Sequence, residues 1–343
     1  MHQELEWIDA IAPDMIKVLK QRYFVLRQVE WMMPVGRRTL ATTLNLSERV
    51  MRTETDFLRK QELIVVGTSG MMLTDQGISV LHGLEKVVDN LVGVRQDEQE
   101  LSRILGIENC LIVSGDSDEQ PKVLDAMGKS VAAKLALLLP EGKNLIAVMG
   151  GTTMAQVADQ LTTRLSIKRD LTFLPARGGV GESVDIQANS ISGKMALQTG
   201  GNHRALYVPE QLSERTYEPL LEEPSIQEVL SLIKESNAVI HSIGEAMHMA
   251  KRRDMSSGII NMLKDDKAVG EAFGYFFDAQ GKVVYKIPRI GLQIEDLTHI
   301  KCIVAVAGGH SKAEAIVAYM KQLAPKQTWL ITDEGAANSI LKK

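Results

Sequence analysis

The sequence of 343 residues has few cysteines, few aromatic residues and no long apolar run. The two cysteines, Cys110 and Cys302, lie far apart inside apolar segments, which indicates buried thiols and excludes a disulfide framework. The most apolar segment, 131–139, contains a lysine and is too short to cross a bilayer. The one close pair of histidines, His241 and His248, has a spacing that fits no metal site on a helix. We therefore expect neither a membrane span nor a metal.

The overall composition is that of a globular protein. Hydrophobic residues make up 45% of the chain and charged residues 24%, and the length suggests two or three domains. The first residues are acidic where a secretory signal would be basic and then apolar, so we expect a cytoplasmic location. The net charge of −4 argues against a protein that coats nucleic acid with its whole surface.

One segment departs from this acidic average. Residues 15–60 contain ten lysines and arginines against four acidic residues, which leaves a local charge of +6. A basic segment in an otherwise acidic chain is typical of a small DNA-binding module joined to a larger body.

The residues before position 95 have helical patterns and one short β signal. Helices are predicted over 15–31, 37–44, 47–61 and 75–94, and a hairpin with a glycine-containing tip over 63–74. Ser47 is a suitable N-cap for the third of these helices. The order helix, short helix, turn, helix and hairpin predicts a winged helix-turn-helix.

The helix predicted over 47–61 has two chemically different sides. The side expected to face the core carries Val50, Glu54, Phe57 and Leu58, with Met51 beside them. The opposite side carries Arg49, Arg52, Thr53, Asp56 and Lys60. A charged side can be a merely solvated surface, but its place between a helix-turn and a hairpin favours a DNA recognition helix.

After position 95, apolar strand-like runs alternate with helical stretches. Strands are predicted over 110–114, 144–149, 171–175, 204–208, 238–243, 301–307 and 328–332. A hairpin over 274–278 and 282–285 interrupts this alternation and is expected at an edge. The alternation predicts a Rossmann-like, doubly wound parallel sheet with helices on both faces.

Three predicted strands are followed by glycine-rich turns. The turns comprise Met149-Gly150-Gly151-Thr152-Thr153, Pro175-Ala176-Arg177-Gly178-Gly179 and Gly308-Gly309-His310-Ser311-Lys312. Glycines let the backbone approach an anion at a helix N-terminus, and threonine, arginine and lysine side chains can bind phosphate oxygens. Each turn alone could be a tight loop and nothing more. Three in one sheet predict a polyanionic small ligand, most simply a sugar phosphate.

Two charged segments have a structural interpretation beside a functional one. Lys251-Arg252-Arg253 lies at a predicted helix end, where basic residues interact favourably with the helix dipole, or could bind a ligand. Asp333-Glu334 lies at a predicted helix start and is expected to cap it, although paired carboxylates can also act as an acid and a base.

Several of these motifs resemble the SorC-type family of bacterial transcriptional regulators, and the resemblance covers essentially the whole chain. It is carried by residues 305–316, 330–337, 149–153 and 275–281. Residues 36–39, 47–52, 175–179 and 271–275 are similar to a branch of that family that represses glycolytic genes and responds to fructose-1,6-bisphosphate. The resemblance implies an effector domain that resembles phosphosugar isomerases and deaminases. Many members have an Asp before Gly-Ile-Gly at the strand over 239–244, and this chain has none, which is compatible with a non-catalytic pocket.

The resemblance also implies which residues bind the effector. Gly151, Thr152, Thr153 and Lys312 would hold one phosphate, and Arg177, Gly178 and Gly179 the second. Gln187, Arg252 and Glu271 would lie near the sugar or its distal phosphate, and the adjacent Arg253 is an alternative to Arg252. No cofactor is implied.

On the DNA-binding side, we expect base contacts from Arg49, Arg52 and Thr53 and phosphate contacts from Arg37 and Arg38. Thr39 and Ser47 complete the predicted DNA-binding set. The predicted domains are a winged helix over 1–75, linker helices over 76–106 and an effector-binding and oligomerisation domain over 107–343. We expect a homo-oligomer, a dimer that forms a tetramer on operator DNA.

A second hypothesis is a phosphosugar isomerase or deaminase with an appended helical domain, because the same fold serves both classes. An enzyme needs a positioned general base with a partner that sets its pKa. The carboxylates of Glu271, Asp333 and Glu334 are the candidates, and no histidine joins them in a recognisable set. The sequence therefore favours a regulator that is not an enzyme.

Overall fold

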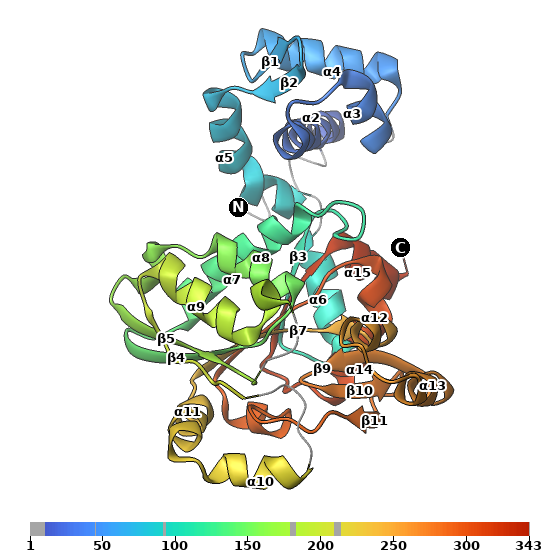
Figure 1. Ribbon diagram of the computed structural model, residues 1–343. Coiled ribbons are helices and arrows are strands. Elements are labelled where there is room, and N and C mark those ends of the chain that lie inside the picture. Colours follow the sequence, from blue (N-terminus) through green and yellow to red (C-terminus); the bar gives the residue numbers. More distant parts are fainter. Residues whose placement is uncertain (1–10, 45, 92–93, 179–182, 209–213, 343) are drawn as a thin grey trace. The chain divides into compact units, whose positions relative to one another are not determined.

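The computed structural model describes residues 11–44, 46–91, 94–178, 183–208 and 214–342 (Figure 1). The chain forms two compact units, residues 1–96 and 97–343. The boundary lies in the first turn of helix α6 (Val94–Leu105), within the segment predicted as linker helices. Each unit is described separately below.

The first unit is the predicted winged helix-turn-helix. It contains α2 (Pro13–Met32), α3 (Arg37–Thr43), α4 (Glu48–Lys60), β1 (Ile64–Gly67), β2 (Gly70–Leu73) and α5 (Asp75–Leu91). Ser47 caps α4 as predicted, because its hydroxyl accepts a hydrogen bond from the Val50 N–H at 3.3 Å. A core that includes Leu26, Leu40 and Met51 lies between the helices and the hairpin. The order of elements predicted for this part of the chain is confirmed.

The buried side of α4 differs from the prediction by about one residue of rotation. Met51 and Leu58 are fully buried, whereas Val50 and Phe57 are each 37% exposed. Phe57 lies under the Arg22 guanidinium, which is 3.5 Å from the ring centroid and also pairs with Glu54 at 2.8 Å. The prediction that Val50 and Phe57 face the core is wrong, because the helix turns Met51 and Leu58 toward the core instead.

The β1–β2 hairpin forms the wing. Beside the tip, Met71 of β2 also forms an isolated antiparallel bridge with Val35. Gly70 has a φ of +137°, and a Cβ there would lie 2.8 Å from the Val35 nitrogen, so only glycine fits. On the outer surface the wing exposes Val65, Val66 and Met72.

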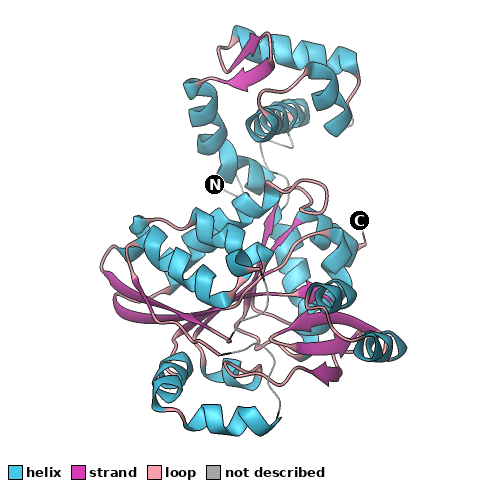
Figure 2. Cartoon of the chain, viewed as in Figure 1, coloured by secondary structure: helices cyan, strands magenta, loops and turns pink. Residues whose placement is uncertain are grey.

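The second unit is built on a seven-stranded parallel sheet with helices on both faces (Figure 2). Its strand order is β3-β13-β12-β7-β4-β5-β6. The strands are β3 (Asn109–Val113), β4 (Gly142–Val148), β5 (Arg169–Pro175), β6 (Asn202–His203), β7 (Ala238–Ser242), β12 (Cys302–Val306) and β13 (Trp329–Asp333). The predicted doubly wound sheet is confirmed.

The segment predicted as a strand over 204–208 is not a strand of the sheet; β6 pairs with β5 up to His203, and after it only the Arg204 N–H donates to the Phe173 carbonyl of β5, at 3.2 Å. The Asn189 side chain explains the difference. Its amide nitrogen donates to the Leu206 carbonyl, and its oxygen accepts from the Leu206 N–H, both at 2.9 Å. The Asn189 side chain thus forms both backbone hydrogen bonds of Leu206 that a neighbouring strand would otherwise form.

The order in which the chain adds strands to the sheet reverses between β4 and β7, although all the strands are parallel. From β4 the chain proceeds outward through β5 and β6, and from β7 it proceeds the other way through β12 and β13. Helices α7 (Val123–Leu138), α8 (Thr152–Gln160) and α9 (Ala188–Thr199) lie on one face, with α11 (Pro224–Lys234) and α14 (Ala313–Gln322) on the other (Figure 1). The remaining helices are α10 (Glu214–Glu222), α12 (Ala246–Arg252), α13 (Ser257–Asp265) and α15 (Glu334–Leu341). Ligands of such sheets bind at the carboxyl ends of the strands beside the reversal.

A second, antiparallel sheet has the order β11-β10-β9-β8. It contains β8 (Gly244–Glu245), β9 (Ala268–Ala272), β10 (Tyr275–Asp278) and β11 (Val283–Lys286). The predicted hairpin is β10–β11, but it belongs to this separate sheet and not to an edge of the parallel one. The pairing of β9 with both β8 and β10 brings Glu271 beside Gly244.

Both cysteines are free and buried, as predicted. None of the described helices is long and apolar enough to span a membrane.

His241 on β7 gives the second unit a pH-dependent stability. Its ring is fully buried between Phe273 and Tyr319, at centroid distances of 4.7 and 5.4 Å, and burial lowers the pKa of His241 to about 4. The unfolded chain then binds the proton more readily than the folded chain does. The free energy of unfolding is therefore highest above the ordinary pKa of 6.5, and it decreases as the pH falls toward 4. We expect a loss of about 2 kcal/mol between pH 7.5 and 5.

Urea unfolding of the wild type and of His241→Phe at both pH values measures this effect. The variant should lose less stability on acidification, and His203→Gln, at an exposed position, should behave as the wild type. Equal losses in wild type and His241→Phe would show that other groups cause the acid sensitivity.

Candidate anion pocket and nucleic-acid interface

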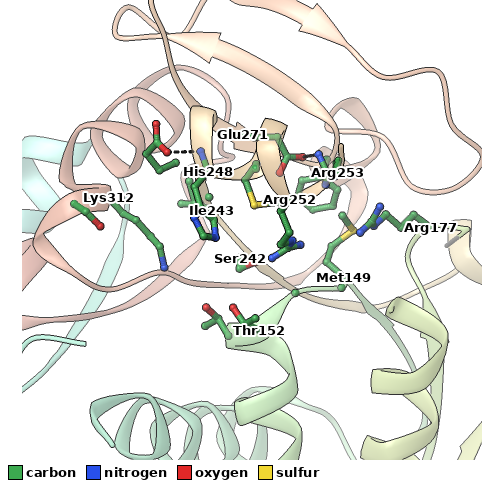
Figure 3. A pocket seen from close by; sticks show the side chains of 18 of the residues that line it. Met149, Thr152, Arg177, Ser242, Ile243, His248, Arg252, Arg253, Glu271 and Lys312 are labelled. Carbon is green, nitrogen blue, oxygen red and sulfur yellow. Dashed lines mark hydrogen bonds and ion pairs between the residues drawn. The ribbon is translucent and has the colours of Figure 1, made fainter. Parts of the chain in front are cut away.

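A cavity of about 390 Å³ lies in the second unit at the carboxyl ends of the parallel strands (Figure 3). Residues at the carboxyl ends of β4 and β7, the two strands between which the strand order reverses, line this cavity. Its lining includes Asp118, Gly150, Gly151, Thr152, Thr153, Arg177, Ser242, Gly244, Glu245, His248, Arg252, Arg253, Glu271, Phe273, Ser311 and Lys312. Figure 3 shows Lys312 on one side of the cavity and Arg177 with Arg253 on the other. We refer to these sides as the lysine end and the arginine end.

The lysine end includes the N-terminus of α8. Gly151 precedes this helix with a φ of +127°, and a Cβ at Gly150 would lie 2.7 Å from the Ile186 carbonyl oxygen, so the turn requires its glycines. The turn presents the first N–H groups of α8 and the hydroxyls of Thr152 and Thr153 to the cavity. Free N–H groups at a helix N-terminus bind anions.

Lys312 supplies the cation at this end. Its side chain is half-buried, and burial lowers the pKa of Lys312, while the carboxylates of Asp118 and Asp333 act in the opposite direction. A lysine desolvated in this way gains more from an anionic ligand than a lysine in bulk water does.

Carboxylates hold the turn that carries Lys312. The Asp118 carboxylate accepts a hydrogen bond from the Ser311 N–H at 2.8 Å. Asp333 accepts from the Gly309 N–H at 2.8 Å, and its other oxygen caps α15 through the Ala336 N–H at 2.9 Å. The predicted helix cap by Asp333 is thus confirmed, and the same side chain also fixes the turn.

The arginine end is a buried cluster of charges. Arg177 and Glu271 are 2% and 4% exposed, and the Arg253 Nη1 lies 3.3 Å from the Glu271 carboxylate. Burial alone would raise the pKa of Glu271, but the guanidinium groups of Arg253, Arg289 and Arg177 outweigh it and hold the pKa below its usual value. The cluster thus favours the ionised form of Glu271, and the lowered pKa makes this carboxylate a weaker base.

The Arg177 turn is held by an extended segment that follows β11. Leu292 N–H donates to the Ala176 carbonyl at 2.7 Å, and Gly178 N–H donates to the Ile290 carbonyl at 3.1 Å. Gly291 has a φ of +138°, and a Cβ there would lie 2.3 Å from the Ala176 oxygen. The two segments can approach this closely only because residue 291 is glycine.

The structure brings together most of the effector residues predicted from the sequence. Seven of them line the cavity: Gly151, Thr152, Thr153, Arg177, Arg252, Glu271 and Lys312. Gly178 is buried behind Arg177, and half-buried Gln187 precedes α9; neither belongs to the described lining. Gly179 lies outside the described residues. Arg252 and Arg253 both line the cavity, so which of them contacts an effector stays a prediction.

Sequence reasoning missed Asp118, Ser242 and Phe273. Asp118 follows β3 and Ser242 ends β7, so a search of every strand end would have found them. Phe273 lies in the turn between β9 and β10, and the sequence offered no signal for it.

The predicted DNA-binding residues lie on one exposed part of the first unit. Arg49, Arg52 and Thr53 are exposed on the same side of α4, and Arg49 lies about one helical turn before the other two. Thr39 on α3 and Ser47 before α4 are exposed as well. The two arginines give this exposed side of α4 a positive charge, and their contacts with DNA stay a prediction.

The two arginines expected on phosphates already have acidic partners on α4. Arg38 pairs with Glu48 at 3.0 Å, and Arg37 pairs with Asp56 at 3.5 Å. Both pairs are partly exposed, so each stabilises the fold little.

Two family models together match nearly the whole chain. Residues 89–342 match the model described as "Putative sugar-binding domain", and residues 18–88 match the one described as "CggR N-terminal DNA binding domain". A protein named central glycolytic genes regulator from Priestia megaterium is 44% identical over 332 residues, covering 97% of this chain and 96% of that protein. A protein of the same name from Bacillus subtilis is 43% identical over 342 residues, covering 100% and 99%.

Solved structures agree with these sequence matches. A "putative SorC family transcriptional regulator from Enterococcus faecalis" is 62% identical, with a TM-score of 0.68 over 72% of this chain and 99% of that chain. The full-length sorbitol operon regulator SorC from Klebsiella pneumoniae is 15% identical, with a TM-score of 0.65 over 93% of this chain and 97% of that chain, which shows a shared fold.

Proposed function

The chain belongs to the SorC-type family of sugar-responsive transcriptional regulators, and from this premise we propose that it represses glycolytic genes until fructose-1,6-bisphosphate binds. Its relatives are regulators with a DNA-binding domain, so the hypothesis of a phosphosugar isomerase or deaminase is set aside. The names of the Priestia and Bacillus relatives support the glycolytic genes as targets.

The observation that carries the choice of effector is the separation of cations within one cavity. Lys312 and the α8 N-terminus form one anion-binding end, and Arg177 with Arg253 forms the other (Figure 3). A sugar with a phosphate on each end can engage both, whereas a monophosphate leaves one end without its anion. Charge matching of this kind supports a bisphosphate, because buried cations gain most from a fully desolvated partner.

The effector acts on DNA binding only through a difference in its affinity for two arrangements of the protein. We propose that the protein binds its operator as a homo-oligomer, a dimer that assembles into a tetramer on DNA, and that the bisphosphate weakens this cooperative assembly. A difference on the order of 10⁴-fold, about 5.5 kcal/mol, would convert a mostly bound population into a mostly free one.

A titration of the full-length protein on labelled operator DNA tests the proposal. The operator is first selected from a random duplex library, and binding is then measured with fructose-1,6-bisphosphate, fructose-6-phosphate or inorganic phosphate. We expect the bisphosphate alone to weaken cooperative binding strongly. Equal operator affinity in the presence of all three compounds would overturn the proposed effector.

A further inference from the structure

Ser242 lies between the two cationic ends of the cavity. It is the last residue of β7 and one of the residues that line the cavity. Figure 3 shows it between Lys312 on one side and Arg177 on the other. Its pairing with Val306 of β12 fixes it at the carboxyl end of the parallel sheet. Ser242 therefore faces the part of a ligand that would join two phosphate groups.

The Ser242 hydroxyl approaches the glycine turn that precedes α8. A Cβ added to Gly151 would lie 3.5 Å from the Ser242 Oγ and 4.0 Å from the Arg252 Nη2. The missing side chain of Gly151 thus leaves a gap that the hydroxyl and the guanidinium both border, and all three residues line the cavity. Glycine at such a position lets a ligand approach the backbone closely. A ligand atom in this gap would lie within reach of the Ser242 hydroxyl.

The Ser242 hydroxyl is available to a ligand. Ser242 is half-buried, and no residue in the described part of the chain forms a hydrogen bond with its Oγ. Its backbone carbonyl, by contrast, lies 3.4 Å from the Nδ1 of His241. A serine hydroxyl can donate one hydrogen bond and accept two. Within the described structure, this hydroxyl therefore keeps its whole hydrogen-bonding capacity for a molecule in the cavity.

Charge alone cannot select a sugar. Cations at the two ends would bind any molecule that carries two phosphates at a suitable separation, whereas the hydroxyls of a sugar are neutral and call for neutral hydrogen-bond partners. A site that hydrogen-bonds a ligand hydroxyl rejects the analogue that lacks it. We propose that Ser242 is a specificity-determining residue, whose hydroxyl forms a hydrogen bond with a hydroxyl of the sugar between its two phosphates. This inference rests on the proposed function.

The probe that tests this role is 1,6-hexanediol bisphosphate, which carries two phosphates on a six-carbon chain and has no hydroxyl between them. Calorimetry on the full-length protein compares its affinity with that of fructose-1,6-bisphosphate, and fructose-6-phosphate is measured on the wild type. The probe is more flexible than a sugar, but the cost of ordering it is the same for every variant. The change in the ratio of the two bisphosphate affinities between wild type and a variant therefore isolates the hydrogen bond.

The variants are Ser242→Ala, Ser242→Cys and the control Ser257→Ala. Ser242→Ala removes the hydroxyl, and Ser242→Cys keeps a side chain of similar size whose thiol is a weak donor. Ser257 is exposed in the first turn of α13 and does not belong to the described lining of the cavity. Thermal unfolding without effector shows whether a substitution disturbs the fold.

We expect both Ser242 variants to lower the preference for fructose-1,6-bisphosphate over the probe about tenfold, because one neutral hydrogen bond is lost. The affinity for the probe and the thermal midpoint should stay at their wild-type values, and Ser257→Ala should match wild type throughout.

Three results would contradict the role of Ser242: an unchanged ratio in both variants, a wild type that binds the two bisphosphates equally well, or a lowered midpoint with an equal loss of affinity for both. A wild type that does not prefer fructose-1,6-bisphosphate over fructose-6-phosphate would instead overturn the proposed function, and this inference with it.

Discussion

Arg177→Ala should bind fructose-1,6-bisphosphate on the order of 100-fold more weakly than wild type, a loss of about 3 kcal/mol. Arg177 is 2% exposed and lines the arginine end of the cavity, so its contact with a phosphate would be almost completely desolvated. Truncating one partner of a buried, hydrogen-bonded charge pair typically costs about 2–5 kcal/mol. Fructose-6-phosphate, bound through the lysine end, should lose little affinity.

Calorimetry with the two sugars measures the change, and Lys312→Ala is the matched comparison. Loss of Lys312 removes the cation at the lysine end and should weaken both sugars. If Arg177→Ala retains the wild-type preference for the bisphosphate, the second phosphate binds elsewhere and the two-ended cavity is the wrong description.

Arg52→Ala should reduce operator affinity at least 30-fold and relax sequence preference. A lost bidentate contact to a base costs about 1–3 kcal/mol, and a two-fold symmetric operator presents the same contact twice. Arg52 is exposed in the middle of α4, and its side chain has no role in the core that the substitution would disturb. Gel-shift titrations on the selected operator and on a shuffled duplex measure both affinity and selectivity.

Arg38→Ala provides the contrast for this experiment. A phosphate contact carries no sequence information, so its loss should weaken the operator and the shuffled duplex by the same factor. Lys60→Ala, at the far end of α4, should have the smallest effect. Arg52→Ala protein with wild-type affinity and selectivity would exclude α4 as the recognition helix in the proposed orientation.

The parallel sheet could be predicted because its inner strands are buried on both faces. Strand β12, for example, is buried at every position and therefore appears as an uninterrupted apolar run. The segment 204–208 has a similar composition, but its pairing depends on the amide of Asn189, a contact that no local pattern reveals. Periodicity likewise predicts α4 correctly but not its rotation, because which of the neighbouring apolar residues is buried depends on packing against other elements, here of Met51 and Leu58 in the core.

The two ends of the cavity differ in how well they could be predicted. The lysine end consists of strand-to-helix turns whose glycines, threonines and lysine are contiguous in sequence, so their chemistry is visible locally. The arginine end is assembled from the Arg177 turn, α12, β9 and the segment after β11. Arg289 has no motif around it, and nothing in the sequence indicates that its charge acts on Glu271.

The wing has a consequence for how the protein searches DNA. Residues 62–74 contain no lysine or arginine, and the exposed side chains of the wing include Val65, Val66 and Met72. Each phosphate that a cation neutralises releases counterions and steepens the salt dependence of binding by about 0.9 in a double-logarithmic plot. A wing without cations releases none, so nonspecific DNA should hold the protein through basic side chains outside the wing, such as Arg49 and Arg52 on α4. Because fewer counterions are released, the affinity for nonspecific DNA is lower and the residence time on random genomic sequence is shorter. Contacts with the bases then supply a larger share of the affinity for the operator.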